Sequence, residues 1–187
     1  MSLGPSTRSL NGGNLQNSIG TIGSTTGLSI QKDQVFDGVR KTVVKLTSVS
    51  VTMTDGTTNG SIGSVKLYDF PEGAINVHCG ATDLTLTAGA GGIGDTAALK
   101  HSVGSAAEAT NDTLDSVQAN IVPSTSLTLA AGTGTKQGIS TAAAHLDGRA
   151  AAAAAYLNLG VADAGSSAND TVTVSGTVTL IWTPMGD

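Results

Sequence analysis

The feature that most constrains the fold is a long alternating run near the C-terminus. Residues 170–183 read DTVTVSGTVTLIWT, so apolar side chains alternate with hydroxyl-bearing ones. Successive side chains of a β-strand point to opposite faces, and this period of two therefore predicts a strand with one apolar face. Gly176 interrupts the run and indicates a bulge or a bend. Trp182, the single tryptophan, closes the predicted strand.

Three runs upstream have the same period. Residues 42–54 (TVVKLTSVSVTMT) and 64–70 (SVKLYDF) are predicted strands, and the turn-forming sequence DGTTNG lies between them. Residues 74–88 (AINVHCGATDLTLTA) are predicted to form one strand, or two strands with a kink at Gly80. In the first run the alternation separates two sets, which are Val43, Lys45, Thr47, Val49, Val51 and Met53, and Val44, Leu46, Ser48, Ser50 and Thr52.

The middle of the chain is less regular. It predicts a strand at residues 96–104, a short strand within 119–132, and one or two helical turns at 111–119 with Asn111 or Asp112 as the cap. Six alanines at 150–155 favour a helix by propensity. The residues after them alternate and an Asp-Gly turn precedes them, so a strand is predicted there instead.

These patterns amount to seven or eight strands without a long helix. The predicted fold class is therefore all-β, an antiparallel jelly-roll-like sandwich that spans residues 35–187.

Residues 1–34 differ from the rest and are predicted to form a flexible, extended N-terminal arm. Residues 1–31 carry a single charge, Arg8, and their apolar side chains are too thinly spread to order the segment alone. Two interpretations remain open, a disordered tail and an arm that orders on a partner. In the second, the candidate contact residues are Leu10, Leu15, Ile19, Ile22, Leu28 and Ile30.

Composition argues against several function classes. Only 12% of residues are charged, the net charge is −5, and no Lys/Arg cluster occurs, which argues against a nucleic-acid partner. A weakly charged surface rich in Ser, Thr, Asn and Gly is a hint of assembly.

Cys79 is the only cysteine, so an internal disulfide is excluded. No signal-peptide pattern or membrane-length apolar run occurs, so we expect no membrane and synthesis in a cytoplasm.

One motif suggests a cofactor. Residues 83–95 read DLTLTAGAGGIGD, and Gly89, Gly91 and Gly94 have the G-x-G-x-x-G spacing of a dinucleotide-binding turn. That turn requires a helix after the glycines inside a parallel βαβ unit. Here Gly104 ends the following segment before a long helix can form, so we expect an inter-strand loop and no cofactor.

Catalytic and metal sites have little support. His78, His101 and His145 lack ligand spacing, and His78 and Cys79 are neighbours whose side chains point to opposite faces of a strand. No serine has a G-x-S-x-G context. The loop 163–170 (DAGSSAND) is a weak calcium alternative without EF-hand spacing. We therefore expect no catalytic, cofactor or metal residues, and no enzyme.

Several strand and turn pieces together resemble a known family. These are VKLYDFPEGAINVHCGATDLTLT at 65–87, IGDTAAL at 93–99, LDSVQANIVPST at 114–125, DGRAAAAAAYLNLGVAD at 147–163 and the closing VSGTVTLIWTPMGD. Over residues 40–187 the chain resembles structural proteins of tailed bacteriophages, notably marine and cyanobacterial ones. The alanine tract departs from that resemblance, because larger β-branched residues are usual at such a position.

The resemblance implies a virion component, a capsid decoration (cement) protein that binds and stabilises the lattice of the major capsid protein. Such proteins are often small β folds and act as trimers on the capsid exterior, after synthesis in the bacterial host. The implied partners are the major capsid protein and further copies of the chain. The alternative is a receptor- or glycan-binding β module of a head fibre or tail. Exposed aromatic side chains would support it. The five present are Trp182, Tyr68, Tyr156, Phe36 and Phe70, and all but Phe36 lie in predicted strands or at their ends, which favours packing roles.

Overall fold

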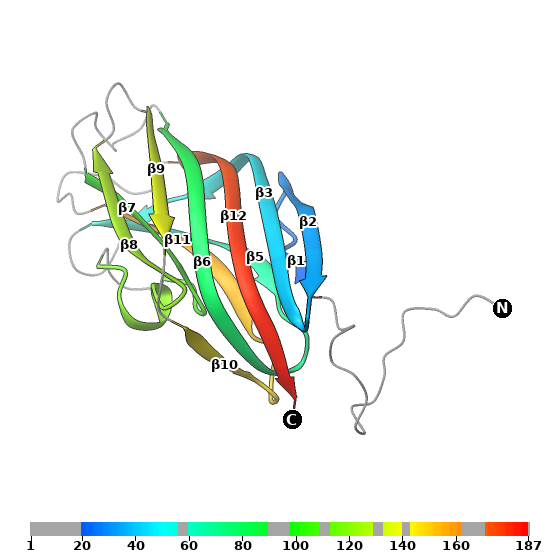
Figure 1. Cartoon of the computed structure of the whole chain (residues 1–187). Helices are drawn as coiled ribbons and strands as arrows, with labels where there is room; N and C mark the ends of the chain where they lie inside the picture. Colours follow the sequence, from blue (N-terminus) through cyan, green and yellow to red (C-terminus); the bar gives the residue numbers. More distant parts are fainter. Residues whose placement is uncertain are drawn as a thin grey trace.

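The computed structural model describes residues 20–55, 60–89, 98–108, 113–128, 133–139, 143–161 and 171–186. These residues form two sheets packed face to face (Figure 1). One sheet has the strand order β1 (Thr21–Ile22), β5 (Ser61–Asp69), β11 (Ala154–Val161), β7 (Ala98–Gly104) and β8 (Val122–Thr128), with β4 (Thr54–Asp55) also on β5. The other has the order β10 (Ala144–Gly148), β6 (Gly73–Ala88), β12 (Thr171–Gly186), β3 (Val39–Thr52) and β2 (Leu28–Phe36), with β9 (Thr133–Ile139) also on β6.

The connections between strands are those of a jelly roll. Strands β3, β12, β6 and β9 lie side by side in one sheet, and β5, β11, β7 and β8 lie side by side in the other. Among these eight strands the chain changes sheet at every step except β7 to β8. Every described pairing is antiparallel. The predicted all-β, antiparallel jelly-roll-like sandwich is confirmed.

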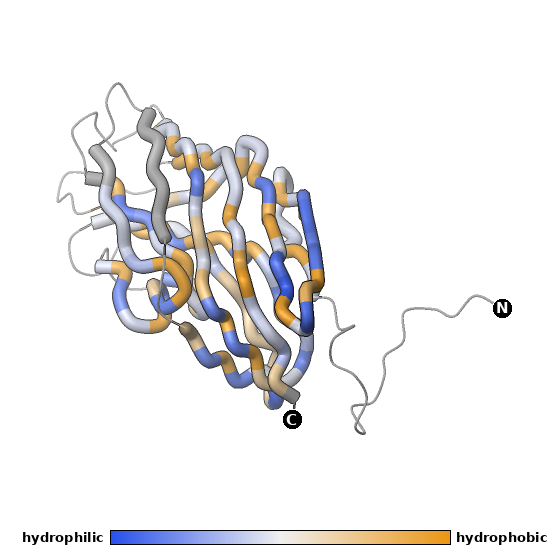
Figure 2. Tube along the Cα trace, in the orientation of Figure 1, coloured by the Kyte–Doolittle hydropathy of each residue, from blue (hydrophilic) through white to orange (hydrophobic). Residues whose placement is uncertain are grey.

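The core lies between the sheets and is filled by the apolar half of each alternating strand. Figure 2 shows apolar and polar positions alternating along β6 and β12. Because aromatics are scarce, Val and Leu provide most of the buried volume. Three of the five aromatic side chains gather at one end, where the Phe70 ring packs edge-on against Tyr68 and Trp182 with both centroid distances at 5.3 Å. The strands predicted at 42–54, 64–70 and 170–183 are confirmed.

A bulge in β3 changes which residues face the core. Val44 and Leu46 are buried before it, and Val49, Val51 and Met53 are buried after it. Thr47 and Ser48 together oppose the single residue Ser175 of β12, and Ser48 has a φ of 49°. The extra residue reverses the alternation, so the two sets predicted by strict alternation exchange faces midway along the strand.

On the partner strand β12, Gly176 avoids a steric clash at the same bulge. Gly176 has a φ of +128°, and a Cβ there would lie 2.1 Å from the Asp83 carbonyl oxygen. The bulge predicted at Gly176 is therefore confirmed. Of the two alternatives predicted for residues 74–88, the single strand is confirmed as β6, and the division into two strands at Gly80 is wrong. The register of β6 against β12 shifts at His78 instead, where Cys79 pairs with Ile181 and Val77 pairs with Trp182.

The alanine tract is divided between a bend and a strand. Residues 149–151 form a bend, and β11 begins only at Ala154. The predicted strand is thus confirmed for its last two alanines and wrong for the first ones. The helical turns predicted at 111–119 reduce to a 3₁₀ turn, η2 (Ser116–Gln118), whose N-cap is Asp115. Asn111 and Asp112 lie outside the described residues.

The outer face of the β11 sheet is covered by the segment around η2. Asn158 of β11 points outward yet is fully buried beneath this segment. Its Oδ1 accepts hydrogen bonds from the Ser64 hydroxyl and the Glu108 N–H, and its Nδ2 donates to the carbonyls of Ala106 and Gln118. Because all four bonds lie at 2.6–3.0 Å, a single amide fixes the covering segment to the sheet.

Residues 20–34 lie within the sandwich, which differs from the arm boundary predicted at residue 34. β2 pairs with β3 along its length, and β1 pairs with β5. The hairpin turn between β2 and β3 is Asp37-Gly38, with φ values of 48° and 80°. A segment too polar to order alone can still add to the edge of an existing sheet, because the sheet supplies its hydrogen-bond partners.

Candidate functional site

The described chain begins at a rigid anchor on one edge of the sandwich. The Gly20 N–H donates to the Tyr68 hydroxyl at 2.9 Å, and the Gly23 N–H donates to the Leu67 carbonyl at 3.0 Å. A Cβ on Gly20 would lie 2.2 Å from the Asp69 carbonyl oxygen, and a Cβ on Gly23 would lie 2.0 Å from the Lys66 carbonyl oxygen. Both positions therefore require glycine. Residues 20–23 are thereby fixed to the sandwich.

A buried polar cluster lies beneath this anchor. The Arg40 guanidinium donates to Asp33 of β2 at 3.3 Å and lies over the Trp182 ring, 5.5 Å from its centroid. Thr42 accepts a hydrogen bond from the Trp182 indole N–H at 3.0 Å and donates to Asp33 at 3.3 Å. Burial raises the pKa of the Tyr68 phenol, which packs beside this cluster. The cluster joins the edge strand to the core through charged and polar contacts.

The edge strand β2 exposes apolar side chains. Among the described residues, five large hydrophobic side chains are exposed, and three of them lie on β2: Ile30 at 37%, Val35 at 46% and Phe36 at 64%. β2 is the last strand of its sheet, so no described strand lies beside one side of its backbone. Long edge strands with exposed apolar side chains pair readily with other chains. We define the apolar edge as Ile30, Val35 and Phe36 with the free backbone side of β2.

The predicted arm residues fall into three groups. Leu10, Leu15 and Ile19 lie outside the described residues. Ile22 on β1 and Leu28 on β2 are half-buried and pack against the core, so they hold the sandwich together. Ile30 belongs to the apolar edge.

Sequence reasoning missed Val35 and Phe36 as surface candidates. The signal that could have found them is the sequence FDGV at 36–39, because Asp-Gly between two β-prone segments predicts a tight hairpin. That hairpin would have placed residues before Asp37 in a strand at the edge of the sandwich.

The glycine motif has the wrong surroundings for a nucleotide. β6 and β7, which flank it, lie in different sheets and not side by side as parallel strands. Gly89 directly follows β6 and donates its N–H to the Thr171 carbonyl at 2.7 Å, while Gly91 and Gly94 lie outside the described residues. The dinucleotide-binding unit therefore does not form around this sequence.

The histidines lie apart from one another. His101 is buried and its Nε2 lies 3.0 Å from the Thr82 hydroxyl, whereas His78 is exposed and its Nε2 lies 2.6 Å from the Thr183 hydroxyl. His145 is exposed on β10. Within the part of the chain that the structure describes, no three His, Cys, Asp or Glu side chains gather in a way that would hold a metal ion. The loop 163–170, the predicted calcium alternative, lies outside the described residues.

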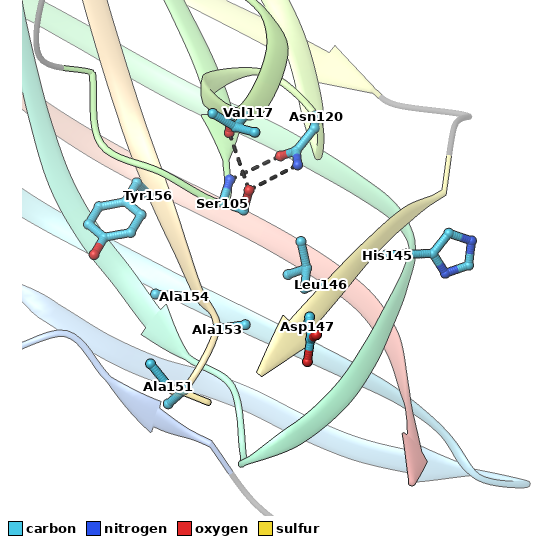
Figure 3. Close-up of a pocket in the computed structure, with 11 residues that line it drawn as sticks. Ser105, Val117, Asn120, His145, Leu146, Asp147, Ala151, Ala153, Ala154 and Tyr156 are labelled. Atoms are coloured by element: carbon cyan, nitrogen blue, oxygen red, sulfur yellow. Dashed lines mark hydrogen bonds between the residues drawn. The ribbon is translucent and has the colours of Figure 1, made fainter. Parts of the chain in front are cut away.

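A shallow hollow of about 350 Å³ lies between β10, the start of β11 and the η2 segment (Figure 3). Leu146, Ala153 and Ala154 form apolar parts of its lining, and Ser105 and Asn120 form a polar part at its rim. Ser105 and Asn120 are bound to each other at 2.9–3.0 Å, so their polar atoms are already partly satisfied. His145 of β10 also belongs to the lining of the hollow.

Comparison with models of known protein families gives no match, and no curated protein is similar enough to count as a relative. Among the described residues, no helix is long and apolar enough to cross a membrane.

Proposed function

We propose that the chain is a bacteriophage capsid decoration (cement) protein that binds the major capsid protein and stabilises its lattice as a trimer on the capsid exterior. The observation that carries the proposal is the coincidence of two features on one side of the body. The fixed anchor at Gly20 and the apolar edge of β2 lie together there, next to 19 residues that precede the anchor.

These features suit a protein that works by contact. A binding segment joined to the body at a fixed point meets a neighbouring surface at a high effective concentration. The apolar edge offers backbone groups and three large side chains to a neighbouring chain on the lattice. Many copies on one lattice add their contacts, and each contact can therefore be weak.

The test is binding to expanded capsids assembled from the major capsid protein of the same genome. The matched pair is the full chain and the chain beginning at Gly20, because that truncation leaves β1 and β2 in place. A cut after residue 34 would remove most of β2 and confuse loss of binding with loss of the edge strand. We expect the full chain to co-sediment with capsids and raise their melting temperature, and the shorter chain to bind at least tenfold more weakly.

Two results would contradict this function. One is failure of the folded full chain to bind either expanded or unexpanded capsids. The other is binding that leaves capsid stability unchanged, because a cement protein must resist lattice disassembly.

The hollow in Figure 3 favours a second candidate, the glycan-binding module. Tyr156 is half-buried at its border, and Asn120 and Ser105 supply the amide and hydroxyl groups that sugars commonly meet in binding sites. Saturable binding on a glycan array that Tyr156→Ala abolishes would favour this candidate over the capsid one. A blank array would remove it.

A further inference from the structure

We propose that the apolar edge of β2 accepts the N-terminal segment of a second copy of this chain, residues 1–19, as an added antiparallel strand. Arms exchanged in this way link copies head to tail. Head-to-tail contacts close into a ring when the rotation between copies permits it, and such a ring is the assembly proposed here. The inference concerns self-assembly and goes beyond binding to a capsid.

The first argument is the character of the edge itself. Sheet proteins normally protect a terminal strand with charges, proline or a covering segment. β2 spans nine residues and places Ile30, Val35 and Phe36 at the surface. Its carboxylate Asp33 is held inward by Arg40 and Thr42, so the protection of the edge is limited to one exposed charge, Lys32, and a bulge between Ile30 and Lys32. An added strand would cover both the free backbone groups and the apolar side chains.

The second argument is length. The nine residues of β2 present an edge about 30 Å long. The 19 residues before Gly20 reach about 65 Å when extended. Half of that length is enough to cover the edge, and the other half is enough to cross from one body to its neighbour.

The third argument is direction. Gly20 bonds to Tyr68, which packs against Trp182, and Trp182 pairs with Arg40. Arg40 pairs with Val35, so Gly20 lies at the Phe36 end of β2. A segment of the same copy that ran straight along β2 into Gly20 would therefore be parallel to β2. Every described pairing in this sheet is antiparallel, and a segment from a second copy is free to approach in that direction.

The experiment measures solution mass without any capsid, by size exclusion with light scattering. Two variants disable different halves of the exchange. The chain beginning at Gly20 keeps the edge and loses the arm, whereas Val35→Lys keeps the arm and places a charge on the edge. Val117→Lys is the matched control, because Val117 on η2 is 45% exposed and Val35 is 46% exposed.

We expect the full chain and Val117→Lys to form the same oligomer, and each of the two disabled variants to be a monomer. Mixing the two disabled variants should restore a one-to-one complex, since one supplies an arm and the other supplies an open edge. Circular dichroism and thermal melting establish that Val35→Lys is folded. Phe36→Lys is the second edge variant if Val35→Lys is not.

Three results would overturn the proposal: a monomeric full chain, an oligomer that survives removal of residues 1–19, or a mixture that stays monomeric. A monomeric full chain whose capsid binding is nevertheless lost in Val35→Lys would assign the edge to the capsid protein instead. Capsid binding is measured separately, so failure of arm exchange and failure of the capsid function give different results.

Discussion

Strands β11 and β12 occupy equivalent central positions in their two sheets, but they are buried differently. In β12 the inward side chains, such as Val178 and Leu180, are buried, while the outward ones, such as Thr177 and Thr179, are half-exposed. In β11 every residue except Tyr156 is buried, whichever face it occupies. The difference arises because the segment around η2 covers one sheet and no described segment covers the other.

The comparison teaches that alternation reports only the face a strand turns toward the core. The outward face of β11 is buried by residues about 40–50 positions away in the chain, which no local pattern encodes. Asn158 fits this position because one amide can both accept and donate, and so satisfies backbone groups that the covering segment would otherwise bury unpaired.

The largest expected effect comes from removing that amide. Asn158→Ala should destabilise the fold by about 3 kcal/mol, because it leaves the Glu108 N–H and the carbonyls of Ala106 and Gln118 without their partner. The measurement is the free energy of unfolding in urea. Thr177→Ala on the open face of β12 is the control, with an expected change within about 0.5 kcal/mol. Equal losses of unfolding free energy at the two positions would contradict the claim that β11 is covered on its outward face and β12 is not.

A smaller loss is expected at the glycine beneath the covering segment. A Cβ at Gly104 would lie 2.2 Å from the Val117 carbonyl oxygen, so Gly104→Ala must push the η2 segment outward. We expect a loss of about 2 kcal/mol, a typical cost of overpacking. Hydrogen exchange should be faster at the Ser105 amide, which bonds to Val117. Unchanged exchange there would mean that the segment adapts without loosening.

A smaller loss of stability is expected from a substitution that faces the inward side of β12. Thr42→Val keeps the shape of the side chain but removes the acceptor of the Trp182 indole N–H and a donor to Asp33. We expect a loss of about 1 kcal/mol in unfolding free energy. A change as large as that of Asn158→Ala would show that the cluster at the end of β12 matters as much as the covered face of β11.

The smallest effect concerns the exposed turn after β10. Arg149 donates to Asp147 at 2.9 Å and, through these hydrogen bonds, lowers the pKa of the Asp147 carboxyl from 3.8 to about 2. A lowered pKa stabilises the fold above about pH 4, and the contribution is lost as the pH falls toward 2. Arg149→Ala should return the pKa toward 3.8, with little change in stability because the pair is exposed. Carboxyl NMR titration measures the pKa, and an unchanged value would exclude Arg149 as the cause.

The candidate site was only partly predictable. Low charge and scattered apolar residues directed attention to the N-terminal segment, and Ile30 does lie on the apolar edge. Val35 and Phe36 were missed because the predicted arm ended at residue 34, although Asp37-Gly38 carried the signal for a hairpin. Whether a polar segment becomes an edge strand depends on the sheet that receives it, and that sheet is assembled from distant parts of the chain.

By itself the sequence determined the strands and the fold class, because side chains alternate wherever one face of a strand meets the core. It also determined the bulge at Gly176, where a side chain would meet the backbone of β6. Only the tertiary structure decided that the extra residue of this bulge lies in β3 at Thr47–Ser48, that the outward face of β11 is covered and that β2 lies at the edge. Each of these depends on contacts between residues far apart in the chain, and the energy of such contacts is absent from any local pattern.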